Sequence, residues 1–348
     1  NYYTRTNKPE DASGKGSLNG EEEYQFSARA MVDRYQKQHF KLSWIVPNYD
    51  VQEINEEAMA SFSEYAAIHD VSAGLWSQNN TPKASPDTTF IQTDTTDPKV
   101  LKNDALILRN NLKRKRPLIF SNTGIAGSQN RTMLAFGDIG GNWENIPTQV
   151  AGFLGASLSG QPLVGSAVDG TAGGGNAQIA IRDFEWKAFT PILFNLDDQG
   201  KFSKTPFAYN SKMTQINRAY LKLREQLQTY LYTLIYRAQV GEPILRPLFL
   251  EFPHEQVNYT PQVGHEFMLG PNLLISPIVN GREDGNGNSR KDNLYLPNHR
   301  TMWVDLFDGK KYLGGRVYNK QSYPSWHLPV FVRGGAIFDL GERNYVLY

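Results

Sequence analysis

Two aspartates that follow short apolar runs are the first candidates for chemistry. Asp94 comes directly after the run 90–93, and Asp138 follows the run 132–136 after one glycine. Cleavage of a glycosidic bond requires two carboxyl groups, because one attacks the anomeric carbon while the other protonates the leaving oxygen. In enzymes that retain the anomeric configuration these groups stand about 5–5.5 Å apart, which neighbouring strand ends of a barrel can supply. We therefore take Asp94 and Asp138 as candidate catalytic residues.

These aspartates and their neighbour Asp97 also have ordinary structural interpretations. Asp97 precedes Pro98 and fits the N-cap of a helix that begins with that proline. Asp138 stands in the glycine-rich segment 137–141, where an aspartate commonly belongs to a turn. An aspartate that ends a strand, as Asp94 does, is also often structural. The local pattern alone therefore leaves both interpretations open.

Other residues at the expected strand ends are candidates for substrate binding. They are Asp50, Trp76, Asn122 and Asp169. An aromatic face at Trp76, Trp143 or Trp186 could stack on a sugar ring, but buried packing explains each tryptophan equally well. We keep both interpretations for all three.

Several other kinds of chemistry are disfavoured. The chain has no cysteine, and its six histidines fall in predicted helices, turns or the later β-rich region rather than at strand ends. A Ser–His hydrolase, a thiol nucleophile and a His-rich or thiolate metal centre are therefore not expected, and we predict no cofactor and no metal. Lys and Arg number 36 against 35 Asp and Glu. That balance argues against a nucleic-acid partner or an anionic membrane surface.

The scaffold for these residues is predicted by the hydrophobic pattern. Short β-like runs alternate with amphipathic stretches, which indicates parallel α/β structure. The expected strands are 2–4, 42–46, 73–76, 90–93, 117–120, 132–136, 162–165 and 189–194. Helices are expected at 21–38, 52–67, 98–112 and 148–158, and one long helix carries an apolar stripe from Ile216 to Ala238. Eight strands predict an α/β fold of the (β/α)8 TIM-barrel type, with Asp94 ending strand four and Asp138 ending strand six.

The last hundred residues differ in character. Short apolar runs at 267–269, 273–276, 295–296, 302–304 and 330–332 are separated by Gly, Pro, Asn and Asp, with no helical stretch between them. This pattern is typical of an all-β sandwich. We predict a catalytic barrel over 1–253 and a C-terminal β-sandwich module over 254–348, with an exposed polar loop at 280–292.

Several segments resemble glycoside hydrolase family 31. The segment 116–129 is similar to the family's fifth-strand region, and Gly137-Asp138 with Trp143 is similar to its acid/base motif. Further similar segments are 160–165, 188–191, 243–253, 267–274 and 329–337. They occur in order from about Trp44 to Ile337. The family's nucleophile motif is an aspartate followed by two further residues, an acidic residue and proline. The segment 94–98 matches this motif, whereas the competing placement at 76–80 offers no carboxylate.

The resemblance implies retaining chemistry on α-linked sugars. Asp94 would be the nucleophile, Asp97 the accompanying acid and Asp138 the acid/base. Glucoside-acting members differ from this sequence at four positions. They carry arginine at the position of Asn122, aspartate at Ala167, arginine at Phe194 and histidine at Leu196. These departures suggest a glycone other than plain glucose, such as α-N-acetylgalactosamine, with Asp169 or Asp50 sharing the work of binding. The family's N-terminal β-sandwich is missing, so we expect the chain to be part of a larger working protein.

Three functions remain open from the sequence. The first is a hydrolase that cleaves a terminal α-linked sugar, including the α-glucoside-acting alternative. The second is an α-transglycosylase, and the third is a non-catalytic carbohydrate-binding relative. A carbohydrate is the expected partner in each case. The sequence does not determine the oligomeric state or the localisation, although a cysteine-free chain suits an exported or cell-surface bacterial protein, and a leader could have preceded Asn1.

Overall fold

The computed structural model describes residues 27–47, 56–77, 90–93, 95, 97–111, 118–137, 140–196 and 202–337. The chain divides into two compact units. The first unit comprises 1–138 with 194–208, and the second comprises 139–193 with 209–348. The expected strand at 2–4 lies outside the described residues.

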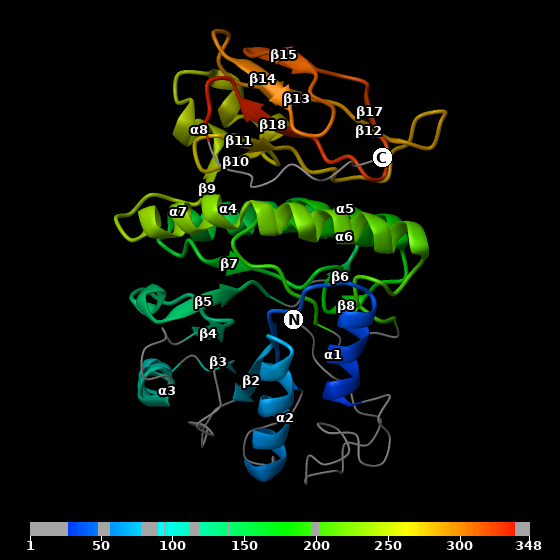
Figure 1. The fold of residues 1–348 in the computed structure, drawn as a ribbon. Helices are drawn as coiled ribbons and strands as arrows, with labels where there is room; N and C mark the ends of the chain where they lie inside the picture. Colours follow the sequence, from blue (N-terminus) through cyan, green and yellow to red (C-terminus); the bar gives the residue numbers. More distant parts are fainter. Residues whose placement is uncertain are drawn as a thin grey trace. The chain divides into compact units, whose positions relative to one another are not determined.

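The first unit is built on a parallel sheet whose strands follow one another in chain order (Figure 1). The strands are β1 (Trp44–Ile45), β2 (Ser72–Ser77), β3 (Phe90–Thr93), β4 (Leu118–Ser121) and β5 (Thr132–Ala135). Their register brings Ser77, Thr93 and Ser121 to one level. The five expected strands from 42–46 to 132–136 are therefore confirmed, and their carboxyl ends share one edge of the sheet.

Two of the helices of this unit begin at a side-chain cap. They are α1 (Ala28–Lys37), α2 (Glu56–Ile68) and α3 (Pro98–Asn111), and a 3₁₀ turn, η3 (Ser128–Asn130), precedes β5. Ser27 caps α1 by accepting a hydrogen bond from the Ala30 N–H at 3.1 Å. Pro98 is the first residue of α3, and Asp97 Oδ1 accepts from the Lys99 N–H at 2.8 Å. The predicted cap and start of this helix are confirmed.

Aromatic rings fill the space beside the sheet. The Trp44 ring lies 4.6 Å from that of Phe90 and 5.0 Å from that of Phe120, centroid to centroid. Phe194 joins them, with its ring 5.9 Å from Phe120. A Cβ atom on Gly74 would overlap the Phe90 ring, so only glycine fits beside that ring.

The second unit begins with short strands, with α4 between the first two of them, and continues with three further helices. A parallel pair joins β6 (Gly140–Gly141) to β8 (Ala172–Gly173), and β7 (Val164–Gly165) lies between them in the chain. The helices are α4 (Asn145–Leu158), α5 (Ala177–Lys187), α6 (Ser211–Gln226) and α7 (Gln228–Ala238). The expected long helix is thus wrong as a single element, because Leu227 ends α6 and precedes α7. Its apolar stripe is nonetheless buried from Ile216 to Leu234.

The expected strand at 189–194 is also wrong. Residues 188–190 form a turn after α5, and only Phe194 has the bridge conformation of a strand residue. The backbone carbonyls that a sheet would have paired are instead bonded to a side chain. Arg224 donates to the carbonyl oxygens of Ala188, Thr190 and Pro191 at 2.8, 2.5 and 2.8 Å. The run is apolar because it is a buried loop, and a short apolar run does not distinguish a buried loop from a buried strand.

The C-terminal part is antiparallel β structure. Its main sheet has the order β15-β14-β18-β11-β10-β9 (Figure 1). Two separate antiparallel pairs, β12-β17 and β13-β16, join strands that are distant in the chain. The main-sheet strands are β9 (Leu245–Pro247), β10 (Phe267–Leu269), β11 (Leu273–Ile275), β14 (Met302–Asp305), β15 (Lys311–Leu313) and β18 (Val330–Arg333). The others are β12 (Ser289–Lys291), β13 (Leu294–Leu296), β16 (Arg316–Tyr318) and β17 (Gln321–Tyr323). Short helical turns α8 (Leu248–Glu251), η4 (Gln256–Tyr259) and η5 (Pro261–Val263) lie between β9 and β10.

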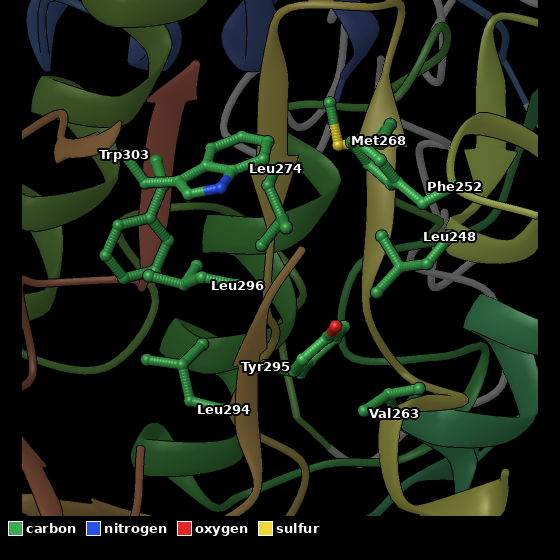
Figure 2. Packing of buried hydrophobic residues seen from close by; sticks show 10 residues of the cluster. Leu248, Phe252, Val263, Met268, Leu274, Leu294, Tyr295, Leu296 and Trp303 are labelled. Atoms are coloured by element: carbon green, nitrogen blue, oxygen red, sulfur yellow. The ribbon is translucent and has the colours of Figure 1, made fainter. Parts of the chain in front are cut away.

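The core of this β module is formed by side chains from both kinds of sheet. Met268, Leu274 and Trp303 of the main sheet pack with Leu294 and Leu296 of β13 (Figure 2). All five are fully buried. The five predicted strands of this part are confirmed, and the expected polar loop at 280–292 contains one additional strand, β12. The chain is therefore an α/β protein with a C-terminal β module, while the division at residue 253 stays a prediction.

Candidate active site

Three of the predicted site residues, Asp50, Asp94 and Asp138, lie outside the described residues. Residues that flank Asp94 and Asp138 belong to the described part of the chain.

The strand that leads to Asp94 ends in a buried polar segment. Gln92 and Thr93 of β3 are buried, and so is Thr95. The Thr95 N–H donates to Thr93 Oγ1 at 3.2 Å, and the Asp97 N–H donates to Thr95 Oγ1 at 3.2 Å. These side-chain bonds turn the chain from the strand into α3, for which Asp97 is the cap. The structural interpretation of Asp97 as a helix cap is thus confirmed.

Trp76 and Asn122 flank this strand end on the two neighbouring strands. Trp76 lies in β2, in register with Gln92, and its half-buried ring packs against the Val46–Phe90 cluster. Asn122 directly follows β4 and is exposed. The structure therefore brings two of the four predicted substrate-binding residues to the carboxyl edge of the sheet, on either side of β3.

Asp169 belongs to the second unit, where it occupies a tight turn. Its φ of 59° lies in the left-handed region, which non-glycine residues seldom adopt. The side chain is buried, with 3% of its surface exposed, and Oδ2 accepts a 2.9 Å hydrogen bond from the Tyr209 hydroxyl. Burial, and next the charge of Asp169, raise the pKa of Tyr209 to about 12. Tyr209 is therefore a permanent donor to Asp169 at physiological pH.

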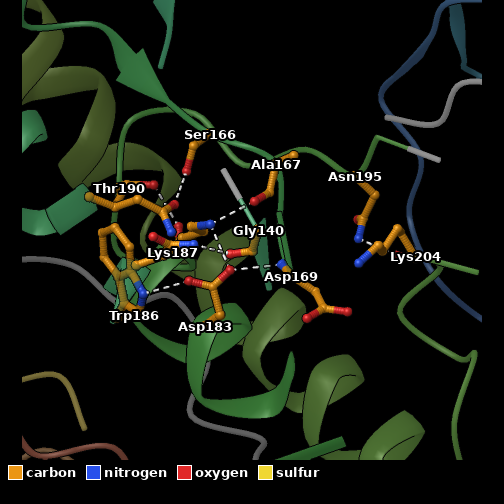
Figure 3. A network of polar contacts seen from close by, with 12 residues as sticks. Gly140, Ser166, Ala167, Asp169, Asp183, Trp186, Lys187, Thr190, Asn195 and Lys204 are labelled. Carbon is orange, nitrogen blue, oxygen red and sulfur yellow. Dashed lines mark hydrogen bonds and ion pairs between the residues drawn. The ribbon is translucent and has the colours of Figure 1, made fainter. Parts of the chain in front are cut away.

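A buried ion pair holds this turn, and the sequence reasoning missed it. Lys187 Nζ lies 2.6 Å from Asp183 Oδ2, and both residues are almost fully buried on α5 (Figure 3). Lys187 also donates to the Ala167 carbonyl at 2.7 Å, while Asp183 Oδ2 accepts from the Asp169 N–H at 2.7 Å. The i,i+4 spacing of two opposite charges on one helix could have revealed the pair.

The other two tryptophans have different surroundings. Trp186 is fully buried, its ring lies 5.3 Å from that of Phe153, and Nε1 donates to Asp183 at 2.9 Å. The packing interpretation is confirmed for Trp186. Trp143 is half-buried and lies against Gly281, where an added Cβ would come within 2.8 Å of the indole nitrogen. For Trp143, stacking on a sugar ring and buried packing both stay open.

Two further features are absent from the described part of the chain. No group of three or more His, Cys, Asp or Glu among those residues is arranged to hold a metal ion. None of their helices is both long enough and apolar enough to cross a membrane.

Comparison with known families gives two matches in succession. The description "Glycosyl hydrolases family 31 TIM-barrel domain" matches residues 99–234, and "Glycosyl hydrolase family 31 C-terminal domain" matches residues 241–338. The first match begins within α3, so it covers the α/β part from there onward, and the second covers the β module.

Curated relatives agree with this family. Alpha-glucosidase 2 from Bacillus thermoamyloliquefaciens is 31% identical over 232 residues, which are 66% of this chain and 28% of that protein. An alpha-xylosidase from Saccharolobus solfataricus is 30% identical over 241 residues, or 67% of this chain and 31% of the relative. The chain thus spans less than a third of the length of either relative.

Solved structures show the same fold at lower identity. A family 31 alpha-xylosidase from Xanthomonas citri aligns with a TM-score of 0.76 at 17% identity, covering 96% of this chain and 46% of the other. A cycloalternan-degrading enzyme from Trueperella pyogenes aligns equally well, at 15% identity over 96% of this chain and 62% of its own. The fold, the two successive domain matches and the curated relatives agree: this chain belongs to glycoside hydrolase family 31, whose members are glycosidases.

Proposed function

We propose that the protein containing this chain is a retaining α-glycoside hydrolase with Asp94 as nucleophile and Asp138 as acid/base. The observation that carries the proposal is the pair of family matches at 99–234 and 241–338. We further propose that the described parallel strands are part of a closed (β/α)8 barrel over 1–253, followed by a β-sandwich module over 254–348. In such barrels catalytic residues end the strands, as Asp94 would end β3.

The reaction would proceed in two displacements. Asp94 attacks the anomeric carbon, and the bond to the leaving oxygen breaks while Asp138 transfers its proton to that oxygen. A β-linked glycosyl ester on Asp94 results. Asp138, now ionised, then removes a proton from water, which attacks the same carbon and releases the α-sugar with Asp94 ionised again. For this sequence of steps Asp138 needs a raised pKa and Asp94 an ordinary one.

The proposed substrate is a terminal α-linked sugar, with α-N-acetylgalactosamine as the leading candidate. Support comes from positions where glucoside-acting members carry charged sugar-binding residues. Phe194 is 5% exposed and packs on Phe120, while Leu196 packs against the Val46–Phe90 cluster. Neither side chain can form a hydrogen bond with a sugar hydroxyl, so neither can bind the sugar as the charged residues of glucoside-acting members would. Asp50, Trp76, Asn122 and Asp169 stay proposed as substrate contacts.

A plain α-glucoside is the main alternative substrate. The curated relatives named above are an alpha-glucosidase and an alpha-xylosidase, and one of the similar solved structures is titled as a dextranase complexed with glucose. An α-transglycosylase would use the same two aspartates but deliver the glycosyl group to a second sugar. Product analysis at high acceptor concentration separates transfer from hydrolysis.

A substrate panel with the complete protein tests the proposal. Aryl α-glycosides of glucose, galactose, N-acetylgalactosamine and xylose would be compared, with Asp94→Ala as the control. Turnover of at least one of them, abolished by Asp94→Ala, is expected, with N-acetylgalactosamine preferred. Sugar binding without turnover over the whole panel would instead identify a non-catalytic carbohydrate-binding protein.

A further inference from the structure

The outward side of α7 exposes two aromatic rings and an aliphatic side chain. Tyr232 and Tyr236 have 69% and 66% of their surfaces exposed, and Val240, in the turn after the helix, has 80% exposed. Successive members of this set are four residues apart, so they follow one side of the helix at intervals of about 6 Å along its axis. We call these three residues the α7 face.

The opposite side of α7 is packed firmly within the second unit, in which α7 lies at one end of the row of helices (Figure 1). The Tyr230 hydroxyl donates a 2.8 Å hydrogen bond to the Leu269 carbonyl oxygen. A Cβ atom on Gly270 would lie 2.5 Å from Leu234 and 2.6 Å from the Tyr230 hydroxyl oxygen, so the β10–β11 turn packs closely against the helix. The backbone that carries Tyr232 and Tyr236 is therefore fixed before any ligand binds, which lowers the entropic cost of binding.

The side chains beside the two rings are mostly neutral. Gln228, Thr229 and Thr233 are exposed on the same helix. The one charged residue in the α7 sequence is Arg237, which lies 3.3 Å from Glu242 in an ion pair. A sugar ring presents C–H groups that stack on the negative face of an aromatic ring, while its hydroxyl groups meet neutral polar side chains. The chemistry of α7 thus suits a neutral saccharide.

The α7 face is too small for a stable protein interface. The helix has 11 residues, so it is roughly 16 Å long and 10 Å wide, whereas a stable interface buries about 800 Å² on each partner. The apolar surface does not continue along α6, which exposes Lys212, Lys222 and Glu225. The α7 sequence also lacks the cluster of basic residues that binds an anionic membrane surface. A saccharide of a few units is the ligand that fits in size.

We propose that the α7 face binds a neutral α-linked oligosaccharide, with two consecutive sugar rings stacked on Tyr232 and Tyr236 and with Val240 extending the apolar contact. This is a second sugar-binding site, formed without any carboxylate pair. It rests on the proposed function only for the class of ligand, because a protein that acts on α-glycosides meets saccharide chains.

Nitration of tyrosine by tetranitromethane tests whether sugar covers the two rings. The complete protein would carry Asp94→Ala, so that no sugar is consumed, and the probes would be maltohexaose and isomaltohexaose. Tyr232 and Tyr236 should react readily in the free protein, because both are exposed. At a sugar concentration about ten times Kd, at least one of the probes should slow the nitration of both tyrosines about 10-fold. Peptide mapping by mass spectrometry measures each site.

Tyr259 is the matched control. It is 57% exposed, but its ring is stacked on that of Phe249 with the centroids 5.7 Å apart, so one face is already covered. Its nitration should be the same with and without sugar. In Tyr236→Ala, the protection of Tyr232 should require about 10-fold more sugar, because one stacking contact is lost. Since Tyr236 is exposed, this variant should still fold.

Protection of Tyr232 and Tyr236 without protection of Tyr259 would support the second site. Three results would overturn it: no protection by either sugar, equal protection of all three tyrosines, or tyrosines on α7 that do not react in the free protein. The last result would mean that a second copy or another part of the protein covers the α7 face.

The test separates this site from the proposed function. If the wild-type protein cleaves no glycoside while sugar protects Tyr232 and Tyr236, the hydrolase proposal fails and the second site stands. If the wild-type protein cleaves glycosides but neither tyrosine is protected, only the second site fails.

Discussion

The Tyr209 hydroxyl donates a 2.9 Å hydrogen bond to Asp169 Oδ2 while its oxygen accepts one from the Gly175 N–H at 2.8 Å. The phenol therefore links the turn that holds Asp169 to the glycine segment before α5. Because burial and the neighbouring carboxylate raise the pKa of Tyr209 to about 12, its proton stays in place over the whole working range of pH.

Removal of this hydroxyl should loosen the turn. Tyr209→Phe keeps the ring but leaves the buried Asp169 carboxylate without this donor, which costs roughly 1–3 kcal/mol. Urea unfolding would measure the loss. Tyr236→Phe, at an exposed tyrosine on α7, is the control and should change little. Equal stability of the two variants would show that the bond contributes nothing.

The buried carboxyl group of Asp104 should make the stability of the protein depend on pH. It is fully buried on α3, and no donor in the described part of the chain reaches either carboxylate oxygen. Burial raises its pKa from 3.8 to about 7. A carboxyl group with a raised folded-state pKa stabilises the fold below about pH 4, and this contribution is lost as pH rises through 7. The wild-type protein should therefore lose stability over this range.

Substitution isolates that effect from those of other buried carboxyl groups. Asp104→Asn cannot ionise, so it should match the wild type at pH 4 and exceed it at pH 8 by about 3 kcal/mol. Burial also raises the pKa of Glu185 and of Glu266 to about 7, but both residues are present in both proteins. Chemical denaturation at the two pH values gives the difference. A difference in stability between the two proteins that is the same at pH 4 and pH 8 would refute the raised pKa of Asp104.

Arg224 should be essential to the loop after α5. Its guanidinium donates to three backbone carbonyls, and burial lowers its pKa only to about 10, so it stays charged at neutral pH. Arg224→Met leaves those carbonyls without donors and should cost about 3–5 kcal/mol. Lys212→Met, on the exposed face of the same helix, should stay within about 0.5 kcal/mol of the wild type in urea unfolding.

The β module should respond to cavities in its core. Leu274 of β11 is fully buried among Met268, Leu296 and Trp303, whereas Leu313 of β15 is 44% exposed. Leu274→Ala should cost about 2–5 kcal/mol through lost burial and an unfilled cavity. Leu313→Ala should cost less than about 1 kcal/mol. Calorimetric melting of both variants checks this, and equal costs would mean that the two strands are wrongly placed.

The sequence predicted those elements that have a regular hydrophobic pattern or a helix cap. The strands from β1 to β5 and the main strands of the β module follow apolar runs, and α3 begins at Pro98 as its cap Asp97 requires. The segment 189–194 misled the prediction because burial, not pairing, makes Phe189 and Ile192 apolar. The break at Leu227 also has no signal, since Leu227 continues the apolar stripe that spans α6 and α7.

The candidate site was predictable only in part. Strand ends indicated Trp76 and Asn122, which the structure places on either side of β3. Asp183 and Lys187 were missed, because their i,i+4 spacing indicates an ion pair but does not reveal bonds to backbone groups 14 and 20 residues away in the chain. Trp186 was left ambiguous, since the sequence does not distinguish a buried ring from an exposed one.

Identification of the covalent intermediate tests the central assignment most directly. The complete protein would be incubated with a 5-fluoro α-glycosyl fluoride of its best substrate, which slows the second displacement, and then analysed by peptide mapping and mass spectrometry. We predict one fluorosugar per active site, attached to Asp94 and absent in Asp94→Ala. Attachment to another carboxylate, such as Asp97, or a first product of inverted configuration would contradict the account.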